Sequence, residues 1–201
     1  MKLPFQWKQG EHLTITGNTG SGKTTFANVL LYARDNTLVL KSKADPAPLP
    51  GRRIGKAIDF VRGTESRYLL YPPFEHQRSE FIRALNTVWK EGGWSVYIDE
   101  LFYMHKIGLE WYIDRLLTQG RSNGITVICG MQRPVGVTRY AMSQATHLVA
   151  FGAERRDVKI LAEIGSDLWG DSVAQLGEHE FAWYYVPKRQ VWTGKVQRLL
   201  T

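Results

Sequence analysis

The chain has 201 residues, of which 43% are hydrophobic, so it can bury a sizeable core within one domain. Its 26 lysines and arginines outnumber its 19 acidic residues, and the net charge of +7 favours a polyanionic partner, although a basic surface that only aids solubility gives the same balance. The sequence predicts no membrane span and no signal peptide, and its single cysteine, Cys129, excludes an intrachain disulfide and fits a reducing cytoplasm.

The first predicted elements are a strand, a glycine-rich loop and a helix. Thr14–Thr16 predict a buried strand, GNTGSGKT occupies residues 17–24, and apolar residues at helical spacing follow from Phe26 to Ala33. The loop fits the pattern G-x-x-x-x-G-K-[ST] in full. Consecutive backbone N–H groups of such a loop, with the positive end of the following helix dipole, attract phosphate oxygens. A glycine turn with a surface lysine is the alternative, and it leaves the flanking strand and helix unexplained.

This loop predicts a nucleotide site with bound ATP and Mg²⁺. We expect Lys23 to neutralise the β- and γ-phosphates and Thr24 to offer its hydroxyl to Mg²⁺. The expected nucleotide-binding residues are Gly17, Asn18, Thr19, Gly20, Ser21, Gly22, Lys23, Thr24 and Thr25.

A basic segment follows the second predicted strand, at residues 37–41. Prolines between residues 46 and 50 predict a loop, and we expect this loop to carry basic side chains that could contact nucleic-acid phosphates. A solvated basic loop is an equally good interpretation. The basic residues in or near the loop are Arg52, Arg53 and Lys56, with Lys41 and Lys43 before it.

An acidic pair ends the next major strand. A short strand at 68–71 and an amphipathic helix that stops at Gly92-Gly93 lead to WSVYIDE at 94–100. Because ligands bind at the carboxyl ends of strands in open α/β sheets, we expect Asp99 to hold the Mg²⁺ shell and Glu100 to polarise a water for attack on the γ-phosphate. An exposed acidic pair is the alternative. The strands at 37–41 and 68–71 separate Thr24 from Asp99, and a strand inserted between the two phosphate-site strands is typical of ring and motor ATPases.

Three further candidates follow a helix marked by Leu109 to Leu117. Arg121 lies in a glycine-flanked turn, and Gln132 and Arg133 lie just beyond the strand predicted at 125–130. If its strand lies beside the Asp99 strand, Gln132 could sense the γ-phosphate or hold the attacking water; the alternative is that it caps a loop. An exposed Arg121 could reach a neighbouring subunit's γ-phosphate; a plain surface arginine is the alternative, and Arg133 is a rival.

The last predicted elements are a strand at 147–152, a helix at 155–164 and a hairpin within 180–199. Strands that alternate with helices predict an α/β fold with a mostly parallel central sheet and a C-terminal β-hairpin. Together with the glycine-rich loop, the acidic pair and the inserted strand, this pattern leads us to expect a three-layer P-loop NTPase of the RecA-like (ASCE) type. We expect one ATPase domain over 1–201, with its core at about 10–165 and a C-terminal helix and hairpin at about 166–201.

The motifs GNTGSGKT, VYIDE, QGRSNGI and MQRP followed by THLVAFG resemble the HerA/FtsK superfamily of DNA-pumping P-loop ATPases, over residues 17–152. The resemblance implies a homo-oligomeric ring, a pentamer or hexamer, that threads double-stranded DNA. It implies Lys23, Thr24, Asp99 and Glu100 as the cis site, Gln132 as the sensor and Arg121 as the trans-acting arginine.

Within that superfamily, the chain most resembles a phage genome-packaging ATPase. The sequence shows no membrane anchor, winged-helix domain or nuclease domain, so a bare motor in the host cytoplasm, which binds a viral portal or procapsid, is the expectation. The alternatives are another translocase of the superfamily (of the conjugation or Zot-like kind), a P-loop kinase, and a non-catalytic nucleic-acid binder that uses nucleotide as a switch.

Overall fold

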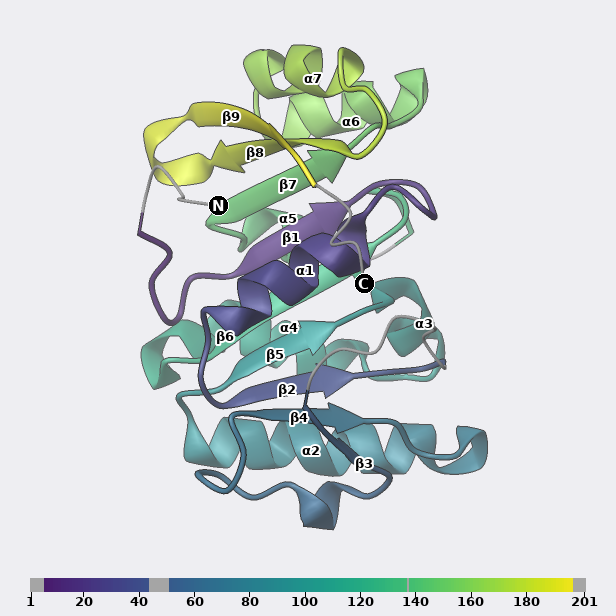
Figure 1. Ribbon diagram of the computed structural model, residues 1–201, viewed down its shortest axis with the longest axis vertical. Helices are drawn as coiled ribbons and strands as arrows, with labels where there is room; N and C mark the ends of the chain where they lie inside the picture. The colour runs from purple at the N-terminus through teal and green to yellow at the C-terminus, as the bar shows by residue number, and fades with distance from the viewer. Residues whose placement is uncertain (1–5, 44–50, 137, 197–201) are drawn as a thin grey trace.

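The computed structural model describes residues 6–43, 51–136 and 138–196. The strands of these ranges are β1 Leu13–Thr16, β2 Thr37–Leu40, β3 Arg52–Ile54, β4 Arg67–Leu70, β5 Ser95–Ile98, β6 Thr126–Met131, β7 His147–Phe151, β8 Glu180–Tyr185 and β9 Gln190–Lys195. They form one sheet in the order β3-β4-β2-β5-β6-β1-β7-β8-β9 (Figure 1). The strands from β3 to β7 in this order are parallel, and β8 is antiparallel to both β7 and β9. The predicted mostly parallel sheet and C-terminal hairpin are therefore confirmed.

Helices cover both faces of the sheet. They are α1 Lys23–Tyr32, α2 Gln77–Glu91, α3 Leu101–Lys106, α4 Glu110–Gln119, α5 Tyr140–Ser143, α6 Arg155–Ile164 and α7 Asp167–Ala174, with 3₁₀ turns at η1 Ala57–Asp59, η2 Phe74–His76, η3 Gly120–Asn123 and η4 Val186–Lys188. Helix α1 lies on the front face in Figure 1, and α2, α4 and α5 lie behind the sheet. None of the helices in the described ranges has the length and apolar composition that crossing a bilayer requires.

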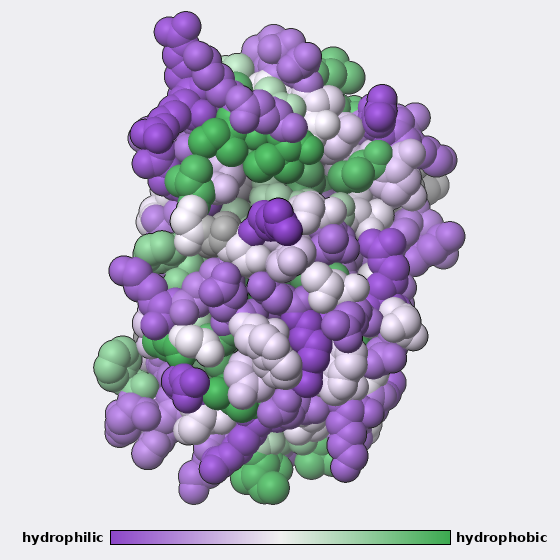
Figure 2. Space-filling model, turned by 180° about the vertical axis from the view of Figure 1, so that it is seen from behind, coloured by the Kyte–Doolittle hydropathy of each residue, from purple (hydrophilic) through white to green (hydrophobic). Residues whose placement is uncertain are grey.

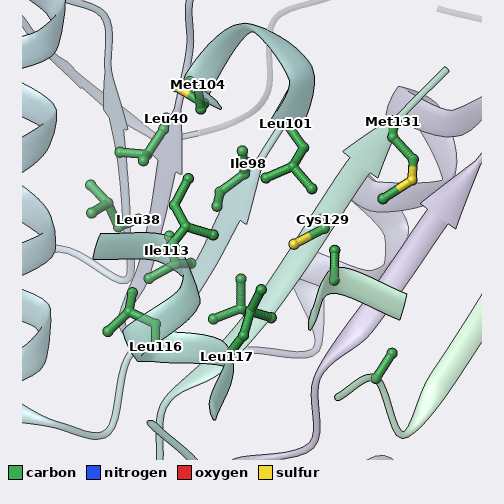
Figure 3. Packing of buried hydrophobic residues seen from close by; sticks show 14 of the residues in the cluster. Leu38, Leu40, Ile98, Leu101, Met104, Ile113, Leu116, Leu117, Cys129 and Met131 are labelled. Atoms are coloured by element: carbon green, nitrogen blue, oxygen red, sulfur yellow. The ribbon is translucent and has the colours of Figure 1, made fainter. Parts of the chain in front are cut away.

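The buried hydrophobic residues form two clusters, one on each face of the sheet. One lies under α1, where Phe26 and Leu30 pack on β1, β7 and the aromatic side chains of β8. The other lies under α2 and α4, where Ile113, Leu116 and Leu117 of α4 point towards the strands (Figure 3). Because each strand between these layers is covered on both faces, its residues are apolar almost without alternation, as parallel sheets require.

The opposite face of the molecule, covered by α2, α4 and α5, is mostly hydrophilic (Figure 2). Hydrophobic colour on this face is restricted to separate patches. Trp111 of α4 is 63% exposed there, whereas Trp169 and Trp183 are buried. The two buried tryptophans belong to the core.

Several short elements differ from the sequence-based predictions. Arg52 and Arg53 were expected in a loop but lie on β3, a short strand at the outer edge of the sheet. Helix α3 was not predicted, because its six residues are too few to display a helical period. The proline-rich stretch expected as a loop, up to residue 50, and the end of the predicted hairpin beyond residue 196 lie outside the described residues.

Candidate active site

The glycine-rich loop joins β1 to α1 at the carboxyl edge of the sheet. Gly17, Gly20 and Gly22 have φ angles of 150°, 81° and 106°, which side-chain-bearing residues rarely adopt. A Cβ at Gly17 would lie 2.7 Å from the Cβ of Phe151 on β7, so no larger residue fits. Gly22 precedes α1 and brings no side chain to cap its first N–H groups. These N–H groups therefore remain available to an anion such as phosphate.

Lys23 lies folded over this loop. Its Nζ donates to the carbonyl oxygens of Gly17, at 2.6 Å, and Asn18, at 2.8 Å. Burial lowers the pKa of Lys23, and the negative charges of Glu100 and Asp99 partly oppose that shift. The amine thus lies within the field of both carboxylates. Phosphate oxygens would be stronger acceptors for this ammonium group than the two carbonyls.

Asp99 follows β5 and is fixed through both carboxylate oxygens. Its Oδ2 accepts a 2.7 Å bond from Nζ of Lys41, and its Oδ1 accepts a 2.8 Å bond from the Tyr97 hydroxyl. The side chains of Lys41 and Asp99 are 7% and 9% exposed. Lys41 was grouped with the basic residues that could contact nucleic acid, but it lies just after β2 as the buried partner of Asp99.

The oxygen donors present suit a magnesium ion. Mg²⁺ prefers carboxylate and hydroxyl oxygens and keeps several waters. Asp99 supplies a carboxylate that its two neighbours keep oriented, and Thr24, at the start of α1, supplies a hydroxyl. These two residues therefore fit the ion that the glycine-rich loop predicts.

Glu100 and Gln132 meet at the same edge of the sheet. Strand β6 pairs with β5 on one side and with β1 on the other. Gln132, just past β6, donates a 3.0 Å bond from Nε2 to Oε2 of Glu100. The strands that precede Glu100 and Gln132 are therefore neighbours, which was the condition for Gln132 to act at the γ-phosphate. However, the strand between the loop strand and the acidic strand is β6, not 37–41, because β2 pairs on the far side of β5.

Arg121 lies just before β6, at the opposite end of the parallel strands from the glycine-rich loop. It belongs to η3, before β6, and its Nη2 donates a 2.8 Å bond to Oγ1 of Thr146. Burial, followed by the nearby charge of Arg121, lowers the pKa of His12 to about 4. The six residues of β6 separate Arg121 from Gln132 by roughly 20 Å at the usual rise per residue. Arg121 is exposed and cannot reach the loop of its own chain.

Arg133 is held within its own chain. Its Nε and Nη2 form 2.9 Å and 3.0 Å bonds with the two carboxylate oxygens of Asp157 on α6. Glu154 lies 3.7 Å from the same guanidinium. Asp157 is buried, so this two-bond contact ties α6 to the end of β6 and leaves Arg133 less free than Arg121.

The expected nucleic-acid contacts lie far from the glycine-rich loop. Arg52 and Arg53 are exposed on β3, which β4, β2, β5 and β6 separate from β1. Lys56 is exposed just after β3. The structure therefore groups these three side chains at one sheet edge and does not bring them to the loop.

Several residues at the loop were not found from the sequence. Lys41 and Tyr97 hold Asp99, and the end-of-strand position of Lys41 is the signal that could have revealed it. His179 and Val196 line a cavity of about 240 Å³ together with Gly20, Gly22, Lys23, Thr24 and Thr25. His179 lies 158 positions after its contact Ser21, so no local pattern could have joined them.

The sheet order, with the glycine-rich loop after β1 and the acidic pair after β5, defines the P-loop ATPase fold. Comparison with known proteins agrees. No family model matches the sequence. The chain is 28% identical over 156 residues to the DNA packaging ATPase P9 of Enterobacteria phage PRD1. That match covers 70% of this chain and 63% of P9, so the chain spans less than two thirds of its relative.

Solved structures share the fold over nearly the whole chain. The genome packaging NTPase B204 of Sulfolobus turreted icosahedral virus 2, in complex with AMPPCP, has a TM-score of 0.77 at 19% identity, over 94% of this chain and 99% of B204. VirB4 of Thermoanaerobacter pseudethanolicus has a TM-score of 0.69 at 10% identity, over 94% of this chain and 90% of VirB4. The resemblance to viral packaging ATPases, predicted from the motifs, is confirmed by the match to P9, and the solved structures share the fold.

Proposed function

We propose that this chain is the ATP-hydrolysing subunit of a ring motor that translocates double-stranded DNA and packages a viral genome into a procapsid. The observation that carries the hydrolytic part is the hydrogen bond between Gln132 and Glu100 beside the glycine-rich loop. The similarity to the packaging ATPase P9 supports the packaging part. The proposal includes a single ATPase domain over 1–201 that acts in the host cytoplasm.

In the proposed reaction, a water attacks the γ-phosphorus, the bond to the ADP oxygen breaks, and the water gives a proton to Glu100. Lys23 and the N–H groups at the start of α1 hold the phosphates. Gln132 orients the water and holds Glu100 towards it. Bound Mg²⁺, held by Thr24 and Asp99, would neutralise charge on the β- and γ-phosphates.

The position of Arg121 supports the proposed ring. An exposed guanidinium that cannot reach its own loop can serve only a neighbour's nucleotide, if it serves one at all. A closed ring of five or six identical subunits would set the loop of one subunit against the Arg121 edge of the next. The portal or procapsid would then bind the assembled ring.

Duplex DNA is the proposed substrate, with Arg52, Arg53 and Lys56 as phosphate contacts. Charged residues also protect edge strands from pairing with other chains, and this role would need no DNA. The two roles differ in salt dependence. If the three residues contact phosphates, the variant with all three changed to Ala should show a slope of log K against log salt that is shallower by roughly 2 to 3. An unchanged slope would place the DNA track elsewhere.

The runner-up is another DNA translocase of the same superfamily, because VirB4 shares the fold as well. A kinase is disfavoured by Glu100, which would direct water to the phosphate that a kinase must protect from water. A nucleotide switch without turnover would bind ATP and not consume it.

The test is the steady-state ATPase rate of the purified chain with and without duplex DNA. We expect hydrolysis that duplex DNA stimulates and that Lys23→Ala abolishes. Lys90→Ala, on the exposed end of α2, is the matched control and should leave the rate unchanged. ATP binding without hydrolysis under both conditions would favour the nucleotide switch, and transfer of phosphate to a small molecule would favour a kinase.

A further inference from the structure

The C-terminal hairpin forms one wall of the cavity at the glycine-rich loop. Strand β9 ends beside the start of α1 (Figure 1). Val196 N donates to the His179 carbonyl oxygen at 2.9 Å, which fixes the two wall residues together. A Cβ at Gly22 would lie 3.7 Å from Nδ1 of His179 and 3.8 Å from Cβ of Val196. The wall thus approaches the loop to van der Waals distance.

The order of the strands determines which end of a bound nucleotide would point towards the acidic pair and which towards the hairpin. The acidic pair and Gln132 follow β5 and β6, on one side of β1, whereas the hairpin follows β7 on the other side. A γ-phosphate that reaches Glu100 points towards β5. The opposite end of the nucleotide then points towards β8 and β9, where His179 and Val196 lie.

The His179 ring is held in place. Its Nδ1 lies 3.3 Å from the Ser21 carbonyl oxygen, which can only accept, so Nδ1 carries the proton of that bond. Its backbone has a φ of 62°, a left-handed conformation that His, Asn and Asp tolerate better than most residues. The side chain is 25% exposed, so one part of the ring faces the cavity.

We propose that His179 and Val196 form the nucleoside subsite of this nucleotide site, with the imidazole ring against the base. This inference rests on the proposed ATPase function. An imidazole ring and a valine side chain offer flat and apolar contact. Val196 has no polar group, and both ring nitrogens of His179 already have partners: Nδ1 lies 3.3 Å from the Ser21 carbonyl oxygen and Nε2 lies 3.3 Å from Oε1 of Glu178. None of the described cavity-lining side chains on the hairpin is therefore placed to read the edge of a base. The subsite therefore binds purine nucleotides with little discrimination between ATP and GTP.

The experiment compares ATP with inorganic tripolyphosphate, which lacks the nucleoside, by calorimetry on the whole chain. His179→Asn removes the ring and suits the left-handed backbone, and Val196→Ala trims the second contact. We expect His179→Asn to weaken ATP binding by roughly ten-fold, a typical loss for one stacked base, and to leave tripolyphosphate binding within about two-fold. Val196→Ala should give a smaller loss in the same direction. His76→Asn makes the same change at an exposed histidine away from the cavity and should alter neither ligand.

The outcomes separate this proposal from the proposed function. Equal losses for ATP and tripolyphosphate would overturn the subsite, because the ring would then only support the loop. Unchanged ATP binding in both hairpin variants would also overturn it and would leave the ATPase proposal standing. A wild-type chain that binds neither ligand would refute the ATPase proposal itself.

Discussion

Arg121→Ala tests whether one subunit completes the site of the next. The roughly 20 Å length of β6 separates this guanidinium from Gln132 of its own chain, so the change should leave ATP binding nearly normal. If Arg121 stabilises the charge on a neighbour's transferring phosphoryl group, turnover should fall by about 10³- to 10⁵-fold, or about 4–7 kcal/mol of barrier. The assay is steady-state hydrolysis together with calorimetry of ATP binding.

A mixing experiment makes this prediction decisive. Arg121→Ala subunits keep an intact loop and acidic pair, and Glu100→Gln subunits keep an intact arginine, so each variant alone should be nearly inactive. In an equal mixture with random assortment around a closed ring, roughly one interface in four joins a good arginine to a good site. The mixture should regain up to about a quarter of the wild-type rate.

The same mixture with Arg133→Ala in place of Arg121→Ala is the control. Because Arg133 is tied to Asp157, we expect this variant to lose stability rather than to complement Glu100→Gln. Assembled mixtures of the Arg121 variant that stay as inactive as their components would refute the trans role. Arg133→Ala subunits that are inactive alone but regain activity when mixed with Glu100→Gln subunits would transfer that role to Arg133.

The remaining predictions concern the acidic pair and two buried groups. Glu100→Gln should bind ATP normally in calorimetry and show no turnover, because an amide cannot accept the proton of water; turnover at the normal rate would exclude Glu100 as the base. Asp99→Asn should weaken Mg²⁺-dependent binding, seen as similar nucleotide affinity with Mg²⁺ and with EDTA. The folded-state pKa of His12, about 4, is below its ordinary value of 6.5, so the stability from its neutral form is complete above pH 6.5 and is lost as the pH falls towards 4. Urea unfolding should show a loss on the order of 3 kcal/mol over that range, and His12→Asn should flatten it. Burial raises the pKa of the Cys129 thiol to about 12, so a thiol reagent at pH 8 should label the chain only after unfolding.

The motifs predicted where the candidate site residues lie in the fold wherever neighbouring residues in the chain determine that position. The glycines, Lys23 and Thr24 are neighbours in sequence, and a strand before them and a helix after them determine the shape of the loop. Asp99 and Glu100 end an apolar strand, so their position at the carboxyl edge follows from the fold class. The pairing of β5 with β6 could only be stated as a condition, because parallel pairing is a long-range choice that local sequence does not reveal.

The parts that were missed depend on contacts between distant segments. Lys41 was grouped with the basic residues in or near the loop, because its charge is visible in the sequence and its pairing with Asp99 is not. Residues 37–41 lie between the glycine-rich loop and the acidic pair in the sequence, so they were also expected between the two strands in the sheet. The strand at that position is β6. His179 reaches the loop only because β8 and β9 extend the sheet beyond β7, and nothing near residue 179 indicates that contact.

The most direct test of the proposed motor is displacement of a fluorescent third-strand oligonucleotide from a duplex. A ring that moves along double-stranded DNA should release the third strand with ATP, and should not release it with AMPPCP or with the Glu100→Gln variant. The proposal predicts release at a rate that follows ATP hydrolysis. DNA-stimulated hydrolysis by assembled, DNA-bound protein without any release of the third strand would contradict translocation.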